Sequence, residues 1–305
     1  MNFFQNTLLA ACLFVRLSVS AGEVTLQDDD LLVSFDSDSG ALTRMEYKPT
    51  HWVIERRPQL GDSFRLFAPL PNRRYNPVFG QKQHAAEVKK ISDNEIQFQW
   101  KNLASQNGGV LPMTLTANVT LTNGILTFNA TLENDSPLTV ETIDYPYFGD
   151  FNPPSRDSSL EARTLRDNKI NELQSDELYP HFRNEKGYWG VTWPTKTLEA
   201  QQSLFCLIQA PEQGLYCEVD KSSAPYRLQY TFEQHPGVIS TANNLVPQTD
   251  EISGWPVHLD FRFCHFIFQR PHTTMKLAPI VLRCYQGDAQ TGMDLYKQWR
   301  AMLSH

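Results

Sequence analysis

The sequence predicts an all-β protein, a large two-sheet antiparallel supersandwich with a short C-terminal amphipathic helix. Three observations lead to this prediction. Apolar residues recur with strand-like spacing from Val24 to Tyr285, an Asn-Gly turn near the middle marks a hairpin, and the last residues change to helical spacing. With 305 residues, of which 41% are hydrophobic and 20% charged, the chain is able to bury a large core.

A β-hairpin over residues 113–133 is the clearest local signal. Asn123-Gly124 is the preferred pair for a two-residue turn, and such a turn fixes the register of the strands on both sides. Because threonine and asparagine alternate with apolar residues, we expect one buried and one solvated face. The facing apolar pairs are Leu121 with Leu126, Val119 with Phe128, Ala117 with Ala130, and Leu115 with Leu132.

Three asparagines of this region, Asn118, Asn129 and Asn134, stand in Asn-X-Ser/Thr sequons. The hairpin register places Asn118 opposite Asn129 on the polar face, where we expect both to be exposed. In a eukaryotic secretory pathway the sequons would be glycosylation sites. The alternative is that threonine and asparagine simply suit a solvated strand face.

Nine further segments have strand-like patterns and are separated by turn-forming residues. Many short strands without alternating helices favour a sandwich over a parallel sheet. Residues 153–183 differ because they are charged and poor in β-branched residues, so we expect either a short helix capped by Ser158 and Glu161 or a long excursion. The strand candidates are Leu31–Phe35, Leu42–Tyr47, Glu95–Trp100, Val140–Tyr145, Leu204–Ile208, Leu215–Val219, Tyr226–Phe232, His258–Phe268 and Ile280–Tyr285.

Residues 1–21 have the pattern of a secretory signal peptide. Thr7–Val15 is a short apolar run, and Val19-Ser-Ala21 supplies small residues for cleavage, although Arg16 interrupts the pattern. The alternative is an ordinary buried N-terminal helix. The signal peptide predicts a secreted or periplasmic protein whose β-domain covers residues 22–286.

Residues 287–305 predict a helix or connector. Thr291 and Asp294 have the spacing of a helix N-cap and the acid at its N3 position, and apolar residues follow three or four apart. A helix this short needs a packing partner. It either lies on the preceding sheets or leads into a further domain. Its apolar positions are Met293, Tyr296, Trp299 and Leu303.

The charge and motif content makes several kinds of partner poor candidates. The net charge is −7 and no Lys/Arg block exceeds two residues, so we expect no nucleic acid and no membrane as partner. Phosphate-loop, dinucleotide and nucleophile-elbow motifs are missing from the sequence, so we expect no cofactor. Four cysteines follow the signal, namely Cys206, Cys217, Cys264 and Cys284, and two disulfides or free buried thiols are both compatible with them.

We expect no metal site. Asp36-Ser-Asp38-Ser-Gly40 starts like a calcium loop, but position twelve is Tyr47 where such a loop needs glutamate, so a tight turn is the better interpretation. The eight histidines are scattered without metal-ligand spacing. No catalytic residue is identifiable among the histidines and acids.

An aromatic cluster is the best candidate for a binding surface. Tyr188, Trp189 and Trp193 follow closely on one another, Gly187 and Gly190 flank the first two, and Trp255 stands apart. Sugar rings stack on such side chains, and loops at strand ends often carry binding sites. We therefore expect the cluster to line a concavity. The alternative is that these rings fill the core.

Several short segments resemble a known family. They are Phe35–Leu42, Tyr145-Pro-Tyr147, Gly214-Leu-Tyr216 and the ending from Gly287 to Trp299. In these the chain resembles the N-terminal supersandwich domain, of galactose mutarotase-like fold, of large bacterial glycoside hydrolases. The resemblance covers roughly Glu23 to Leu303, and its motifs are short.

The resemblance implies a carbohydrate context and a partner, either carbohydrate or a catalytic (β/α)₈ barrel domain that the sequence lacks. The catalytic carboxylates of that family belong to the barrel, which would need about 250 residues after Leu303. The function expected is thus a non-catalytic accessory domain of a secreted glycoside hydrolase-like protein. The alternatives are a complete mutarotase-like aldose epimerase and a purely structural β-sandwich.

Overall fold

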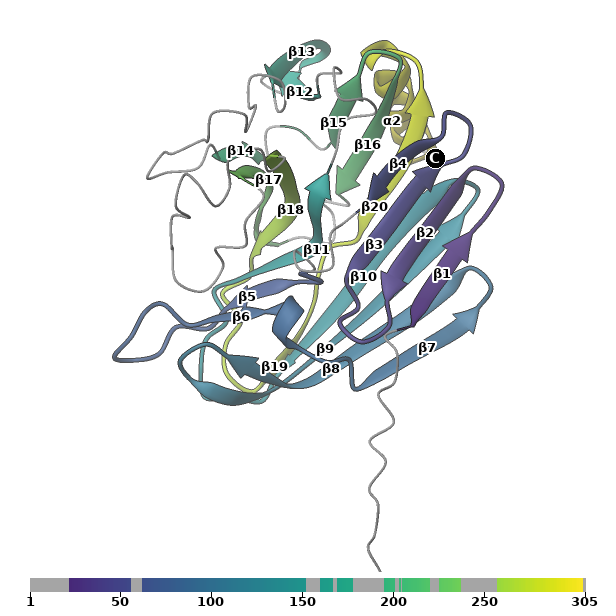
Figure 1. The fold of residues 1–305 in the computed structure, drawn as a ribbon. Helices are drawn as coiled ribbons and strands as arrows, with labels where there is room; N and C mark the ends of the chain where they lie inside the picture. Colours follow the sequence, from purple (N-terminus) through teal and green to yellow (C-terminus); the bar gives the residue numbers. More distant parts are fainter. Residues whose placement is uncertain are drawn as a thin grey trace, which may run out of the picture.

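The computed structural model describes residues 22–55, 62–151, 160–166, 169–177, 195–200, 203, 205–219, 225–236 and 257–303. Their strands form sheets of ten, six and four strands, with antiparallel pairing between the hydrogen-bonded neighbours (Figure 1). The predicted antiparallel sandwich is confirmed. A four-stranded sheet is present in addition to the two sheets that the sequence predicts.

The three sheets draw on distant parts of the chain. The ten-stranded sheet has the order β13 (Lys169–Glu177), β12 (Glu161–Arg166), β15 (Phe205–Ala210), β16 (Gln213–Val219), β20 (Ile280–Gln286), β10 (Ile125–Asn134), β9 (Gly109–Thr122), β8 (Glu95–Ser105) and β7 (Glu87–Ser92), and β19 (Thr273–Lys276) also pairs with β10. The six-stranded sheet has the order β14 (Thr195–Glu199), β17 (Arg227–Pro236), β18 (Val257–Phe266), β11 (Thr142–Phe151), β5 (Arg65–Phe67) and β6 (Pro77–Phe79). The four-stranded sheet runs from β1 (Glu23–Gln27) through β2 (Leu31–Asp36) and β3 (Leu42–Tyr47) to β4 (Trp52–Glu55).

The β9–β10 hairpin has the predicted register. Leu121 pairs with Leu126 and Val119 with Phe128, and all four side chains are buried. Asn118 pairs with Asn129 as expected, but both are half-buried, so the expectation of full exposure was wrong. Neighbouring side chains on that face account for the difference, since Gln97 Nε2 donates to Asn118 Oδ1 over 2.9 Å.

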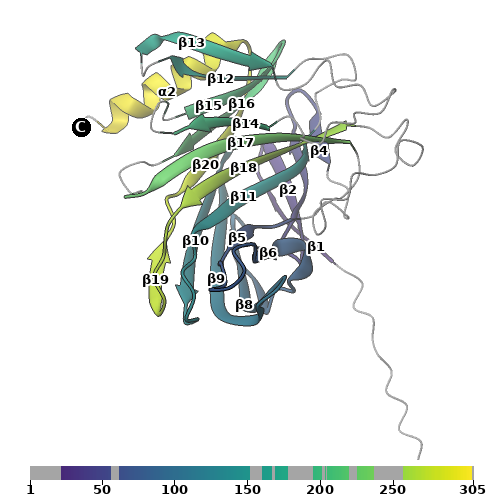
Figure 2. The ribbon, with the colours of Figure 1, turned by 90° about the vertical axis from the view of Figure 1, so that its left-hand side faces the viewer.

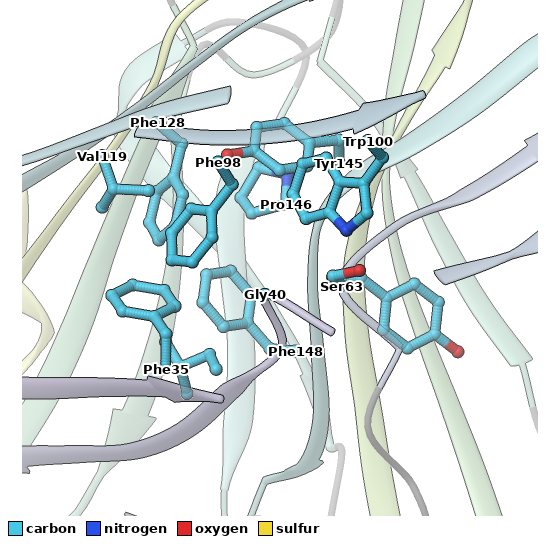
Figure 3. A pocket seen from close by; sticks show the side chains of 12 residues that line it. Phe35, Gly40, Ser63, Phe98, Trp100, Val119, Phe128, Tyr145, Pro146 and Phe148 are labelled. Carbon is cyan, nitrogen blue, oxygen red and sulfur yellow. The ribbon is translucent and has the colours of Figure 1, made fainter. Parts of the chain in front are cut away.

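One hydrophobic core joins the inner faces of all three sheets. Phe98 of β8 packs on Phe35 of the four-stranded sheet at 5.4 Å between ring centroids, and Phe128 of β10 packs on Phe148 of the six-stranded sheet at 5.6 Å. A cavity of only about 10 Å³ remains at this junction, and Figure 3 shows the aromatic rings turned toward it. The junction is therefore closely filled, and its lining is almost entirely apolar.

The C-terminal helix α2 (Ala289–Leu303) packs on β15, β16 and β20 (Figure 2). The Tyr296 ring packs on the Phe205 ring in a tilted arrangement with 4.5 Å between the centroids, and Met293 is also buried. The prediction that Thr291 caps the helix was wrong. Asp288 comes first in the chain, and its Oδ1 accepts hydrogen bonds from the backbone N–H groups of Gln290 and Thr291 over 3.0 and 3.2 Å.

Two other segments resolve alternatives that the sequence left open. Asp36–Gly40 is a tight turn in which Asp36 Oδ1 accepts hydrogen bonds from the backbone N–H groups of Asp38 and Ser39. Residues 161–166 and 169–177 form the antiparallel pair β12–β13, so neither the helix nor the excursion was right for this part. The thiols of Cys206, Cys217, Cys264 and Cys284 are free, and three of these residues are buried. In the described residues no helix has the length and apolar character to cross a membrane.

A buried histidine links strands across the core. His265 is fully buried, Ala278 N–H donates to the Tyr226 hydroxyl over 2.7 Å, and that hydroxyl lies 3.1 Å from His265 Nδ1. On the other side His265 Nε2 lies 2.7 Å from the Tyr145 carbonyl oxygen. A neutral imidazole with its proton on Nε2 satisfies every one of these bonds.

Replacing Gly40 tests the junction. Gly40 has φ +70° and a Cβ there would collide with the Trp100 ring, so Gly40→Ala should lower the free energy of unfolding by about 2–4 kcal/mol. Gly109 is the matched control, because it has φ +68° but nothing within 4 Å of a Cβ. Urea unfolding of both alanine variants separates packing from backbone strain. Equal losses would show that the Trp100 contact contributes nothing.

Acidification should destabilise the fold through His265. Burial lowers the pKa of His265 to about 4 from 6.5, so protons favour the unfolded chain. Stability is then present above pH 6.5 and falls toward pH 4, by about 3 kcal/mol for this group. The measurement is urea unfolding between pH 7 and pH 4.5 for the wild type and for His265→Gln, with the exposed His272→Gln as control. An unchanged slope in His265→Gln would contradict the assignment.

Candidate functional site

The outer face of the six-stranded sheet gathers charged and polar side chains into register rows. Along β18, Phe261 and Phe263 point into the core, so the alternate residues Asp260, Arg262 and Cys264 point outward. We call this outer surface the polar face. It consists of Glu199, Gln229, Cys264, Asp144 and Arg65 in one row, Thr197, Thr231, Arg262 and Tyr147 in the next, and Asp260, Arg227 and Asp62 beside them.

Tyr147 lies at the centre of the polar face between two arginines. The guanidinium of Arg65 lies 5.1 Å from the Tyr147 ring centroid, and that of Arg262 lies 5.6 Å from it. The Tyr147 hydroxyl donates to Asp260 Oδ2 over 2.6 Å and accepts from Arg65 Nη2 over 3.0 Å. The β11 register shifts just before Tyr147, at Pro146, which has no N–H to donate to the ladder.

Carboxylates hold the two arginines. Arg65 Nη2 lies 3.1 Å from Asp62 Oδ2, and Arg262 Nε lies 3.2 Å from Asp144 Oδ2. All four side chains are at least four-fifths buried. The exposed fraction is 3% for the Asp62 side chain and 18% for that of Arg65. Buried charges are costly, and such groups cluster at functional sites more often than elsewhere.

The other end of the first row, around Glu199 and the neighbouring Arg227, is exposed to water. Arg227 forms a bidentate ion pair with Glu199, and Gln229 Nε2 also donates to Glu199. The guanidinium of Arg227 lies 5.0 Å from the Phe266 ring centroid, and its side chain is 56% exposed. The polar face therefore has a buried half around Tyr147 and an exposed half around Arg227.

The buried half is fixed in its charge states. Burial alone would lower the pKa of Arg65, but Tyr147 and the nearby carboxylates hold it well above its usual value. Burial raises the pKa of Tyr147, so the hydroxyl remains a neutral donor. Burial and the neighbouring Asp144 raise the pKa of Cys264, so this thiol stays protonated at neutral pH. The arrangement offers both donors and acceptors without a free nucleophile among the described side chains.

A second hollow lies on the far side of the large sheet. It has about 470 Å³, and its walls come from β12, β13, the β15–β16 turn and the start of α2. Gln209 forms part of it, but its amide already bonds the carbonyls of Gln213 and Gly287 and the Tyr285 hydroxyl. This hollow is therefore a weaker candidate than the polar face.

The predicted aromatic residues Tyr188, Trp189, Trp193 and Trp255 lie outside the described residues. The described residues that flank them in the chain lie at one end of the six-stranded sheet. There Thr195 pairs with Glu233, and Pro236 pairs with Val257. Asp260 pairs with Glu233 at the same end. The described strand residue Thr195 is thus two register positions from Asp260 across the sheet.

Sequence reasoning missed the arginines and carboxylates of the polar face. The Tyr145–Tyr147 segment was noted as a family landmark, and the β18 strand was predicted, but no residue of either was assigned to a site. The usable signal was the alternation Asp260-Phe-Arg262-Phe-Cys264, which places charges on one face of a strand. Within the described part of the chain, no group of three His, Cys, Asp or Glu is arranged to hold a metal ion.

Comparison with known proteins identifies the fold. No protein-family model and no curated protein matches the sequence. A proposed aldose 1-epimerase from Escherichia coli K12 superposes with a TM-score of 0.52 at 13% identity, covering 87% of this chain and 99% of that one. A galactose mutarotase-like protein from Lactobacillus casei gives 0.51 at 11% identity, covering 87% and 100%. The fold is that of a galactose mutarotase-like sandwich.

The same fold occurs within a larger enzyme. The GH36 α-galactosidase from Geobacillus stearothermophilus superposes with a TM-score of 0.50 at 9% identity, covering 88% of this chain but only 41% of the α-galactosidase. This chain is thus similar both to whole single-chain proteins and to part of a multidomain one. At these identities the likeness concerns the fold.

The three sequons should differ in their use. Asn134 is fully buried, and its Nδ2 donates to the carbonyls of Leu138 and Arg270, so a glycan has no room there. Asn118 and Asn129 are half-buried and retain access to solvent. On expression through a eukaryotic secretory pathway, mass spectrometry should find glycan at Asn118 or Asn129 and none at Asn134. Occupancy of Asn134 would contradict its burial.

Proposed function

We propose that this protein binds carbohydrate on the polar face of its six-stranded sheet. The observation that carries the proposal is Tyr147 with a guanidinium near its ring on two sides and a carboxylate on its hydroxyl. A sugar hydroxyl both donates and accepts hydrogen bonds, so its binding site must present acceptors and donors close together. The fold, shared with mutarotase-like proteins, supports the proposal by analogy only.

In this proposal the aromatic residues supply the second part of the site. Tyr188, Trp189, Trp193 and Trp255 would stack on the apolar faces of the sugar rings, while the polar face orients the hydroxyls. Support comes from the chain positions of their segments, which adjoin the β14, β17 and β18 ends that carry Asp260. Trp189→Ala should then reduce saccharide retention without changing the melting temperature.

We further propose that the protein is a non-catalytic accessory domain of a secreted glycoside hydrolase-like protein, with residues 1–21 directing export to the periplasm or the medium. Its partner would be a carbohydrate chain or a catalytic barrel domain. Every carboxylate described in the buried half already has an arginine or tyrosine partner, which favours binding over proton transfer.

A complete aldose epimerase is the second candidate. His235 and His258 are direct register partners on β17 and β18, and His258 stands two positions before Asp260. A mutarotase-type reaction needs an acid and a base on one cleft, and imidazole titrates in the right range. His258→Gln would abolish anomerisation in this case and leave saccharide binding in place.

Two measurements on the purified chain decide between these functions. Binding to a panel of neutral mono- and oligosaccharides is measured by calorimetry, and anomerisation of D-glucose and D-galactose by polarimetry. Binding without anomerisation supports the accessory domain, and rapid anomerisation supports the epimerase. If the chain shows neither saccharide binding nor anomerisation, it is a purely structural module.

Removing the Tyr147 hydroxyl should weaken saccharide binding. Tyr147→Phe leaves Arg65 and Asp260 without their shared partner, so we expect about tenfold lower affinity, or ~1.4 kcal/mol. Tyr75→Phe is the matched control, since Tyr75 lies on the loop between β5 and β6 and is 42% exposed. Equal affinity of the two variants would exclude the buried half of the polar face from binding.

A further inference from the structure

We propose that the outer edge of the Arg227 guanidinium binds two neighbouring hydroxyl groups of a saccharide, that is, a vicinal diol. This inference rests on the proposed function, because it names the contact that the exposed half of the polar face makes with the same ligand. The outer edge consists of Nη1 and the second N–H of Nη2. Two parallel N–H groups of a guanidinium suit two adjacent oxygen acceptors, and a vicinal diol presents such a pair.

Glu199 occupies only the inner edge of this guanidinium. Arg227 Nε donates to Glu199 Oε1 and Oε2 over 3.1 and 3.0 Å, and Nη2 also donates to Oε1. A guanidinium has five N–H groups, and these bonds use the one on Nε and one on Nη2. Within the described part of the chain, the two N–H groups of Nη1 have no hydrogen-bond partner. A ligand can therefore bind the outer edge without breaking the ion pair.

The outer edge is also accessible and held in place. The Arg227 side chain is 56% exposed, and its guanidinium lies over the Phe266 ring at 5.0 Å from the centroid. The ring supports one face of the guanidinium, and the bonds to Glu199 fix its direction. Binding then costs less side-chain entropy than it would at an unrestrained arginine.

Neighbouring side chains keep Glu199 in position and ionised. Gln229 Nε2 also donates to Glu199 Oε1, and the hydrogen bond from Arg227 lowers the pKa of Glu199. An anion at the outer edge would therefore lie close to a like charge, whereas a hydroxyl oxygen would not be repelled. Gln229 pairs with Cys264, and Cys264 pairs with Asp144, so this exposed unit is continuous with the buried half of the polar face.

A second exposed arginine–glutamate pair provides the comparison. Arg74 Nη2 donates to Glu141 Oε2 over 2.7 Å, and the Arg74 side chain is 79% exposed. This pair has one hydrogen bond where Arg227 and Glu199 have three, and no ring contact among the described residues holds the Arg74 guanidinium. Arg74 has the same chemistry without the fixed orientation, so it should contribute little to saccharide binding.

A cycle of variants and ligands tests the inference. Methyl β-D-galactopyranoside and methyl β-D-glucopyranoside, each with its 2-, 3- and 4-deoxy derivatives, are titrated by calorimetry into the wild type and Arg227→Lys. Lysine keeps the charge but does not offer two parallel N–H groups. Arg227→Lys should weaken binding of the parent glycoside about tenfold. The loss should shrink to about threefold for two of the deoxy derivatives, and their missing hydroxyls should be neighbours on the ring.

Controls separate the inference from the proposed function. Arg74→Lys should bind every glycoside within about twofold of the wild type. Glu199→Gln releases the guanidinium from its inner edge, should weaken the parent glycoside about threefold, and replaces Arg227→Lys if circular dichroism shows that variant to be unfolded.

Three results would overturn the inference and leave the proposed function in place. They are an unchanged affinity in Arg227→Lys, an equal loss for the parent and all its deoxy derivatives, and a smaller loss at a single position. A wild type that binds only larger saccharides of the panel would also overturn it. Binding of no saccharide of the panel would reject the proposed function itself.

Discussion

The meeting of three sheets on one aromatic junction is the constraint on which the rest of the fold depends. The same inner face of β8–β10 packs on the four-stranded sheet through Phe98 and on the six-stranded sheet through Phe128. Because the remaining cavity is so small, no sheet can rotate or slide without opening a void. Gly40 belongs to this constraint, since only a residue without Cβ allows Trp100 to close the junction.

The junction also explains why the charged groups collect where they do. Every strand of the six-stranded sheet that packs inward must turn its alternate residues outward. Phe261 and Phe263 on one side of β18 thereby fix Arg262 on the other, and the register with β11 brings Arg262 beside Tyr147. The well-packed core thus fixes which residues form the polar face and how they are ordered on it.

The sequence predicts those parts of the structure that local chemistry decides. Asn123-Gly124 sets the β9–β10 register by itself, so every facing pair was predictable. The polar face was not, because its rows join β14, β17, β18, β11 and β5, whose order in the sheet does not follow the chain. The helix start was misplaced because Asp288 competes with Thr291 as cap, and the charged strands β12 and β13 lie at the border of the large sheet, where apolar alternation is weak.

The other border of the large sheet has a consequence for how these molecules behave in concentrated solution. Among the described strands, β7 is hydrogen-bonded on one side only, to β8, and a flat apolar strand in that position would invite another chain to add to the sheet. Its exposed residues are instead mostly charged. Lys89 forms an ion pair with Glu87, and Lys90 forms one with Asp93. A partner strand would have to bury these ammonium groups. The charges on β7 therefore make the addition of a further strand to this wide β-sheet costly.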